Sequence, residues 1–267
     1  MNILQINQHT PPPRHIKPPI YQKGVALYVV IVMVLLSMLL ALWASRTSLF
    51  NEMLVGNDAD YQRAFEAAQA MLQDAEMDIR GVNSDGTLCV VDATDGDICR
   101  RTTSVYFEFE TKDIDTIFST IESQGTAAAA TKCFKGICQK RTDPQDFWND
   151  KTILGQMISL NVGARYGQFT GAKYKSDNKT GNPILNDRTL DATDPSKSKG
   201  AWYWIEILPY VDQNISLLGN MPPGANILTY APSRKKPFIY RITALARGLK
   251  PGTEVVLQST LSIKPSE

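Results

Sequence analysis

The feature that most constrains this chain is an uncharged apolar run, Val25–Ala44, close to the N-terminus. As a helix that rises about 1.5 Å per residue, a run of about 20 residues crosses a hydrocarbon core roughly 30 Å thick. Three Lys or Arg residues precede the run, and the first acidic residue of the chain is Glu52. Because basic residues mark the cytoplasmic flank, we expect residues 1–24 in the cytoplasm and the rest of the chain across the membrane.

A cleaved secretory signal is the alternative interpretation of this run. It requires a shorter apolar stretch followed by a small-x-small cleavage site. Cuts after Ala44 or Ser45 would place Leu42 or Trp43 at the position that must be small. The sequence therefore predicts a retained transmembrane helix, residues 25–44. The part beyond it, about 220 residues, is long enough for one domain with a sizeable core or a domain with a large insertion.

The part expected beyond the membrane holds all four cysteines and neither of the two histidines. In an oxidising compartment, an even number of cysteines indicates disulfides. Three pairings are possible, and proximity in the sequence favours Cys89–Cys99 and Cys133–Cys138. A zinc site is the alternative, but neither pair has the CxxC spacing and no histidine lies nearby. Without histidine, His-dependent catalysis is excluded there, and we predict no enzyme activity, no cofactor and no metal.

Several smaller signals have a functional and a structural interpretation. The net charge of +1 gives no electrostatic case for nucleic acid. Asp92–Asp97 could hold calcium, but it lacks the EF-hand spacing and is typical of a solvated acidic turn. Trp202–Trp204 could form a binding platform, although aromatic residues of strands usually pack in the core. Arg234–Lys236 could contact lipid headgroups or DNA, but is typical of a solvated surface. Ala127–Ala130 is expected in a loop.

Residues 45–80 are predicted to continue the membrane run as an amphipathic helix. Apolar residues at alternating spacings of four and three predict one stripe that packs on a domain, formed by Tyr61, Phe65, Ala68, Leu72, Ala75 and Ile79. Charged residues fall largely off this stripe, among them Asp60, Arg63, Glu66, Asp74 and Asp78. Gly56-Asn57 is the weak point, because Gly costs about 1 kcal/mol relative to Ala in a helix interior. Gly81 suits the C-cap.

Residues 81–200 are rich in turns and are predicted to form a variable, disulfide-bearing insertion. Val105–Glu110 is expected to be a strand and Ile114–Ser123 a short helix. Thr152–Tyr166 is ambiguous between helix and strand, and Gly171–Gly200 is expected to be a long exposed loop.

Residues 201–267 are predicted to form an antiparallel sheet. Three segments are rich in aromatic and β-branched residues: Ala201–Tyr210, Lys236–Gly248 and Glu254–Ile263. In the middle segment apolar residues alternate with polar ones, which indicates one buried face. Pro251-Gly252 supplies the turn of a hairpin. The predicted fold class is α+β, with a long N-terminal helix packed on an antiparallel β-sheet.

Two stretches at opposite ends of the chain carry a family resemblance. The first, Lys23–Glu76, has Lys-Gly directly before an apolar helix that runs on as an amphipathic one; its most telling part is Asn51–Ala70, with Met53, Gly56-Asn57 and AFEAAQA. The second, Tyr240–Thr260, reads YRITALARGLKPGTEVVLQST. With these stretches the chain resembles type IV pilins and, among them, the PilX-type minor pilins, which are type IV pilus assembly proteins.

The resemblance implies that residues 1–24 are a prepilin leader. Prepilin peptidase would cut between Gly24 and Val25, and the new amine of Val25 would be methylated. The mature chain would cross the inner membrane once, hold its C-terminal domain in the periplasm, and join other minor pilins and the major pilin in the pilus. Two residues depart from the major-pilin pattern: the first mature residue is Val25 where Phe is usual, and the fifth is Val29 where Glu is usual.

Some minor pilins and pseudopilins also lack this glutamate. Its absence argues against a bulk subunit of the shaft. The resemblance thus implies a non-enzymatic component that primes pilus assembly at or near the tip and supports twitching motility and adhesion. Two alternatives stay open: a minor pseudopilin of a type II secretion system, and a membrane-anchored periplasmic protein that binds or hydrolyses a substrate.

Overall fold

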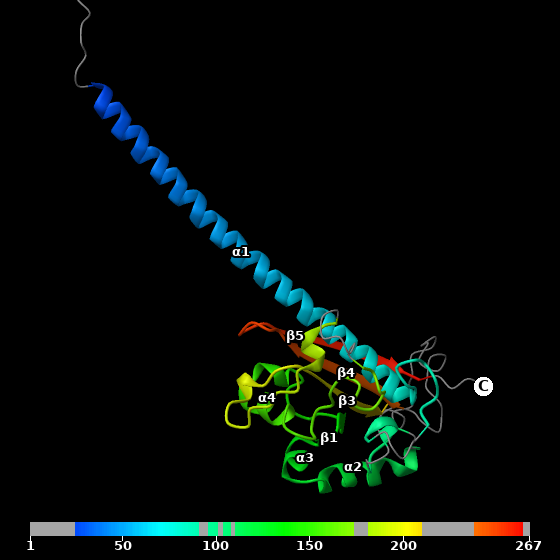
Figure 1. Ribbon diagram of the computed structural model, residues 1–267. Coiled ribbons are helices and arrows are strands. Elements are labelled where there is room, and N and C mark those ends of the chain that lie inside the picture. Colours follow the sequence, from blue (N-terminus) through cyan, green and yellow to red (C-terminus); the bar gives the residue numbers. More distant parts are fainter. Residues whose placement is uncertain are drawn as a thin grey trace, which may run out of the picture. The chain divides into compact units, whose positions relative to one another are not determined.

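The computed structural model describes residues 25–90, 96–100, 104–107, 110–173, 181–209 and 238–263. It has a long N-terminal helix and a five-stranded sheet (Figure 1), which confirms the predicted α+β class. The chain divides into two compact units, Met1–Leu54 and Val55–Glu267, and the sheet lies in the second.

Helix α1 spans Val25–Arg80 and contains the apolar run. It continues without interruption through Gly56 and Asn57, the predicted weak point. At its end Gly81 has φ 63°, and Val82 N donates to Met77 O at 3.1 Å. A left-handed residue after the last turn, with such a bond back into the helix, is a C-cap that glycine forms at least cost. The predicted cap is therefore confirmed.

The buried face of α1 in the second unit is rotated from the predicted stripe. Its apolar members are mostly small: Ala64, Ala67, Ala68, Met71, Ala75 and Ile79. Tyr61 is 49% exposed, whereas Asp60, Asp74 and Asp78 are buried, so the prediction that these acids lie off the packing face was wrong. Small side chains let the helix approach the sheet closely, and each carboxylate is hydrogen-bonded there, which offsets the cost of burying it.

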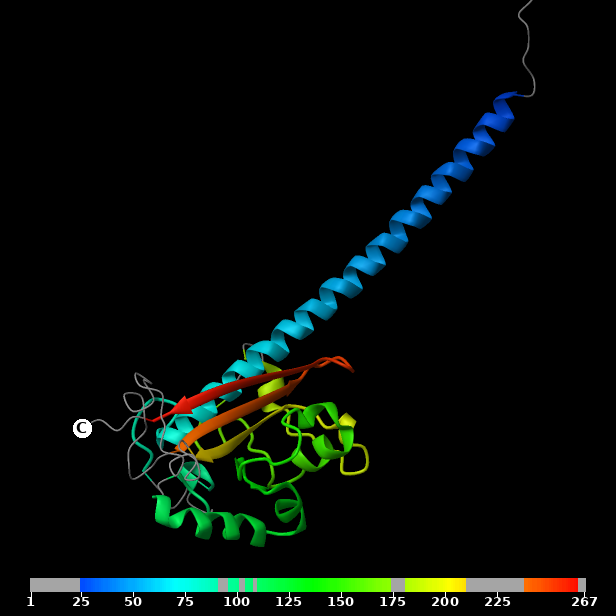
Figure 2. The same cartoon turned by 180° about the vertical axis from the view of Figure 1, so that it is seen from behind.

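The sheet has the order β1-β2-β3-β4-β5. Its strands are β1 (Cys133–Phe134), β2 (Ile137–Cys138), β3 (Ala201–Pro209), β4 (Phe238–Arg247) and β5 (Glu254–Ser262). β2 pairs with β3 in parallel, and the other neighbours are antiparallel. Figure 2 shows β3, β4 and β5 side by side. These are the three strands that the sequence predicted; Tyr210 and Lys236, at the predicted ends, lie outside the described residues.

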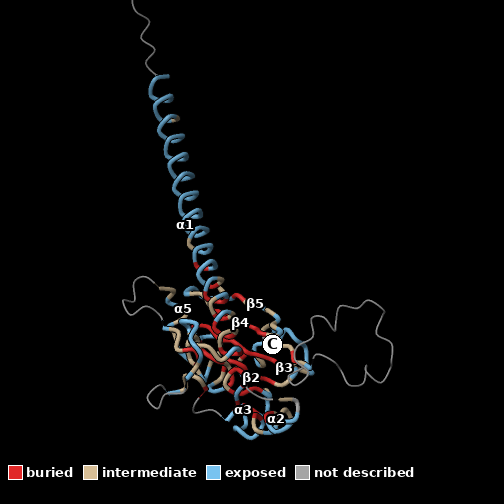
Figure 3. The backbone as a smooth tube through the Cα atoms, turned by 90° about the vertical axis from the view of Figure 1, so that its right-hand side faces the viewer, coloured by how far each residue is buried: buried red, intermediate tan, exposed pale blue. Residues whose placement is uncertain are grey.

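Both faces of β3 and of much of β4 are covered, so the prediction of a single buried face was wrong for these two strands; β5 is mostly exposed or half-buried. On one face, α1 packs against side chains such as Tyr203, Ile242 and Ala244. On the other, Trp202, Trp204 and Leu245 meet the 3-10 helix η3 (Phe147–Asn149) and helix α4 (Lys151–Met157), together with both cysteines of the Cys133–Cys138 pair. Figure 3 shows the resulting concentration of buried residues around the sheet. The expectation that Trp202–Trp204 packs in the core is confirmed.

The middle of the chain is mostly short helices. α2 spans Ile114–Ser123 as predicted. α3 (Thr126–Thr131) replaces the expected loop at the alanine run, because alanine has the highest helix propensity. The described residues 104–107 form no strand, which contradicts the prediction for Val105–Glu110, and residues 108–109 lie outside the description. α4 resolves the ambiguous segment in favour of a helix over part of its length.

Further short 3-10 helices are η1 (Ile98–Arg100) and η2 (Thr111–Asp113). The expected exposed loop Gly171–Gly200 instead contains α5 (Pro183–Asn186) and η4 (Pro195–Lys197), and Ile184 is buried. Asn182 and Asp194 start these two helices by accepting hydrogen bonds from Ile184 N and Ser196 N. A polar cap followed by proline is a local signal that starts a helical turn even in a polar segment.

Candidate functional site

The first unit offers one continuous apolar helical surface. Val25, Val29 and Trp43 are 60%, 48% and 73% exposed, and no residue in the most apolar window of α1 is buried. α1 is long and apolar enough to cross a membrane. A helix that is apolar on every side needs an apolar solvent, which a bilayer or a bundle of similar helices supplies.

The start of α1 carries no acidic residue in its first turn. Val25 opens the helix, whereas the predicted leader residues, Gly24 among them, lie outside the described part of the chain. Val29 presents only methyl groups at the position where major pilins carry a carboxylate. The first turn of the helix therefore holds no acid that could pair with the amine of another subunit.

Asp60 joins α1 to the β4–β5 hairpin. Its carboxylate is 1% exposed and accepts hydrogen bonds from Leu249 N at 2.9 Å and Lys250 N at 3.1 Å. Burial acts to raise the pKa of Asp60, but hydrogen bonds from Thr253 and these two amides hold the pKa below its ordinary value. The carboxylate is thus charged, and it fixes the hairpin by satisfying backbone donors that the tight turn leaves unpaired.

Two glycines lie beside this contact. Asn57 Oδ1 accepts from Lys250 Nζ at 3.0 Å, and a Cβ on Gly56 would lie 2.7 Å from that Nζ. A Cβ on Gly248 would run into the carboxylate of Asp60 and approach Thr253 Cβ to 2.6 Å. The stretches that carry the family resemblance, Asn51–Ala70 and Tyr240–Thr260, therefore meet here.

Asp78 is the centre of a buried charge network. Arg100 donates from Nε to Oδ1 at 2.8 Å and from Nη2 to Oδ2 at 2.6 Å, and Tyr203 donates its hydroxyl to Oδ2 at 2.8 Å. The guanidinium also stacks over the Phe169 ring, 3.9 Å from its centroid. Burial, followed by the nearby carboxylates, raises the pKa of Tyr203 well above its ordinary value, so the phenol stays a donor. The network ties α1 to β3 and to the segment after Cys99.

Asp74 lies one helical turn before Asp78 and holds a loop. It accepts from Gly167 N at 2.8 Å and forms a short hydrogen bond with the Thr170 hydroxyl. Burial raises the pKa of Asp74 to about 6, although both hydrogen bonds oppose the shift. The loop residues 165–172 are thereby fixed against α1.

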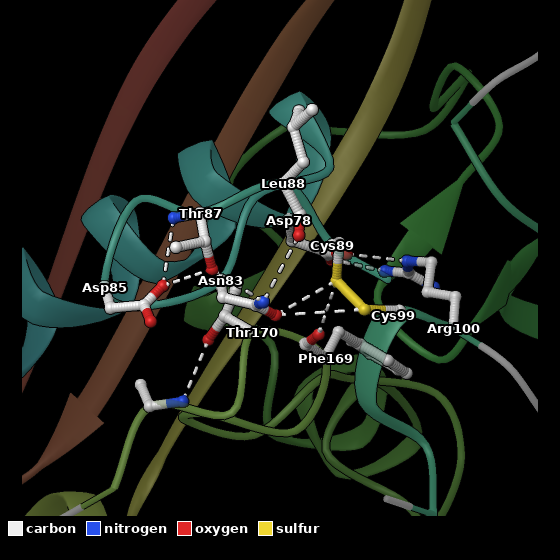
Figure 4. Close-up of a disulfide and its surroundings, with 11 residues drawn as sticks. Asp78, Asn83, Asp85, Thr87, Leu88, Cys89, Cys99, Arg100, Phe169 and Thr170 are labelled. Atoms are coloured by element: carbon white, nitrogen blue, oxygen red, sulfur yellow. Dashed lines mark hydrogen bonds and ion pairs between the residues drawn. A yellow bond between two sulfur atoms is a disulfide. The ribbon is translucent and has the colours of Figure 1, made fainter. Parts of the chain in front are cut away.

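The disulfide Cys89–Cys99 closes the segment beside this loop (Figure 4). Cys99 N donates to Phe169 O at 2.8 Å, and Ser84 N donates to Thr170 O at 3.0 Å. The second disulfide, Cys133–Cys138, joins the facing ends of β1 and β2. Both pairings are those favoured by proximity in the sequence, and neither leaves a free cysteine among the described residues.

The acidic segment Asp92–Asp97 is described only at its end. Residues 92–95 lie outside the described part, and Asp97 forms an ion pair with Lys135 at 3.0 Å. Within the described ranges no group of three metal-ligating side chains occurs. Arg234–Lys236 also lies outside the described residues.

Sequence reasoning missed the three buried aspartates. The helical spacing of Asp60, Asp74 and Asp78 places them on the same face as Ala64, Ala67 and Met71, and this face was the available signal. A search for large apolar residues at helical spacing does not select this face, because alanine is small and aspartate is charged.

An apolar N-terminal helix and an α+β domain with a largely antiparallel sheet fit a membrane-anchored subunit of the pilin class. The chain belongs to the PilX family: the PilX N-terminal profile matches residues 23–73, and the profile described as Type IV pilus assembly protein PilX C-term matches residues 134–263. It is a minor pilin of the type IV pilus. The C-terminal match also includes much of the middle segment, which the sequence resemblance left unassigned. Neither the curated proteins nor the solved structures contain a match.

Proposed function

We propose that this minor pilin primes pilus assembly at or near the tip and is not a repeated subunit of the shaft. The observation that carries the proposal is Val29 on the exposed first turns of α1. A carboxylate in a membrane helix costs about 2.5–3.5 kcal/mol at the bilayer centre, so a pilin that has one is expected to need a charged partner. In the family, that partner is the N-terminal amine of a subunit already in place.

Val29 cannot form this pair, so the chain gains no electrostatic stabilisation from docking beneath an earlier subunit. Its own Val25 amine can still receive the glutamate of the next one. Such one-sided pairing suits a first or early subunit. The partners are then other minor pilins and the major pilin, with the C-terminal domain in the periplasm before assembly. Support of twitching motility and adhesion would follow from normal piliation.

Processing must come first. We propose that prepilin peptidase cuts between Gly24 and Val25 and that the Val25 amine is methylated, because Lys23-Gly24 abuts the apolar helix and no small-x-small site follows. Mass spectrometry of the mature N-terminus should find methylated Val25, and Gly24→Val should leave the precursor uncut. An intact leader on assembled protein would contradict the proposal.

Labelling decides the placement. Immunogold particles against the exported domain are expected at the ends of purified pili, and a deletion strain is expected to lose most of its pili. Label spread evenly along the shaft would refute tip placement, and normal piliation in the deletion strain would refute priming. The pseudopilin alternative predicts instead a loss of secretion with pili intact; the match to a pilus assembly family favours the pilus.

A further inference from the structure

A pocket of about 110 Å³ opens on the sheet face opposite α1. It lies where the end of α3, the β1–β2 hairpin and α4 meet strands β3 and β4. Apolar groups from the second core cluster line it: the Cys133–Cys138 disulfide, Phe147, Met157 and Trp204. Because α1 packs on the other face, the helix of the same chain does not cover this pocket.

The polar groups inside the pocket already have partners. Glu206 accepts from Arg241 Nε at 2.6 Å and from Arg141 N at 2.9 Å. Thr243 Oγ1 accepts from Gln258 at 3.0 Å, and Trp204 Nε1 donates to Met157 O at 3.0 Å. The interior therefore lacks a strong unpaired donor or acceptor among these groups, and it favours an apolar group.

The rim of the pocket is basic. Lys132 and Lys140 are exposed, and neither ammonium group forms an ion pair or hydrogen bond with the described residues. The Arg141 guanidinium is held by Pro144 O at 2.9 Å and lies over the Phe147 ring. Asp143 is the acidic residue of this rim, since Glu206 is already neutralised by Arg241. Two free positive charges thus flank an apolar hollow.

We propose that this pocket is a docking site for an acidic segment of another protein, which inserts one compact apolar side chain and sets its carboxylates against Lys132 and Lys140. The volume decides the size of the inserted group: a cavity of about 150 Å³ holds benzene, so one of about 110 Å³ accepts a side chain of leucine size and no larger ring system. The two lysines lie in different segments, Lys132 directly after α3 and Lys140 after β2, which suits charges distributed along a chain. The proposal does not depend on tip placement.

Peptide binding to the mature full-length chain in detergent micelles tests the site. The probe is a fluorescent seven-residue peptide with one leucine between two pairs of aspartates, and its controls replace the leucine by serine or the aspartates by asparagine. We expect saturable binding of the probe that weakens with added salt. Both control peptides should bind about tenfold more weakly, because each loses one of the two complementary features.

Two variants with matched controls locate the binding. Ala130 is exposed and lines the pocket, so Ala130→Trp fills the mouth, whereas Ala129→Trp places the same side chain beside it on α3. The pair Lys132→Glu and Lys140→Glu reverses the rim charge, and Lys112→Glu reverses an exposed charge elsewhere. The pocket variants should weaken binding about tenfold or more and the control variants less than twofold.

Thermal unfolding of every variant checks that the domain still folds, since all five substitutions are at the surface. Absence of saturable binding, equal binding of the serine control peptide, or equal loss in Ala129→Trp would each overturn the proposal. Selective loss in the pocket variants, with unfolding unchanged, supports it.

Discussion

Asp60, Asp74 and Asp78 hold three different parts of the domain to one helix. Asp60 accepts hydrogen bonds from the β4–β5 hairpin, and Asp74 accepts them from the loop 165–172. Asp78 accepts hydrogen bonds from both Arg100 and Tyr203. A hydrogen-bonded buried charge adds little net stability, but its directional bonds accept only one arrangement of donors. These residues therefore specify how α1 sits in its own domain more than they stabilise it.

Removing one partner of the Asp78 network should be severe. Asp78→Ala removes the carboxylate that accepts from Arg100 Nε, Arg100 Nη2 and the Tyr203 hydroxyl, and we expect the free energy of unfolding, measured in urea, to fall by about 3–5 kcal/mol relative to the wild type. Asp115→Ala, at an exposed site of α2, is the control and should change stability little. Combining Asp78→Leu with Arg100→Met should recover part of the loss; a double variant no more stable than Asp78→Ala contradicts the account.

Asp74 should give the domain a pH-dependent stability of definite sign. Its pKa is raised from 3.8 to about 6, so between these values the folded chain binds a proton that the unfolded chain does not, and this contribution falls as the pH rises. The free energy of unfolding of Asp74→Asn should therefore rise relative to that of the wild type between pH 3.8 and about 6. The rise should be on the order of 2–3 kcal/mol and should persist at higher pH. Urea unfolding at several pH values measures it. Asp115→Asn should show no such trend, and parallel profiles of Asp74→Asn and wild type would refute the prediction.

At the scale of elements, the sequence predicted those whose pattern repeats. β3, β4, β5 and α2 are long enough for alternation or helical period to show. β1 and β2 have two residues each, and they join the sheet because the β1–β2 hairpin pairs with β3 through Ile137 and Cys138, a contact distant in sequence. The second covered face was missed for the same reason: Leu245 packs in one cluster with residues of η3 and α4, which no local pattern connects to β4.

α1 supports a prediction about Gly56. The helix is continuous there, and the nearest group to an added Cβ is the flexible end of Lys250, so Gly56→Ala should fold normally and gain up to about 1 kcal/mol from helix propensity. We nevertheless expect fewer pili. In a bilayer every backbone group of the helix must be hydrogen-bonded internally, but in a filament neighbouring subunits can replace those bonds. The glycine then lets the helix loosen at this point during assembly, and alanine would resist that loosening.

Counting surface pili by electron microscopy, beside urea unfolding, separates assembly from folding. Ser48→Ala makes a similar small change in the same helix without removing a glycine, and should leave piliation normal. Unchanged piliation in Gly56→Ala would remove the argument for loosening.

At the scale of the whole molecule, more of the fold and of the family could be predicted from the two ends of the chain than from its middle. The apolar run of residues 25–44 predicts a membrane helix from length and composition alone, and Asn51–Ala70 meets Tyr240–Thr260 through Asp60 and Asn57. The pocket beside Cys133–Cys138 was not predictable, because its walls come from seven elements (α3, β1, β2, η3, α4, β3 and β4) and only folding brings them together.

On the proposed placement at the tip, Val29→Glu should move this subunit toward the shaft. The new carboxylate costs about 2.5–3.5 kcal/mol at the bilayer centre until it pairs with the amine of a subunit already assembled, so the variant gains a reason to dock beneath one. Immunogold labelling of purified pili should then find label along the filament as well as at its ends. Val30→Glu carries the same charge about 100° further round the helix, where the pairing geometry is lost, and should enter pili less than the wild type. An even spread of label with Val30→Glu as well, or label confined to the ends with Val29→Glu, would show that position 29 does not set placement.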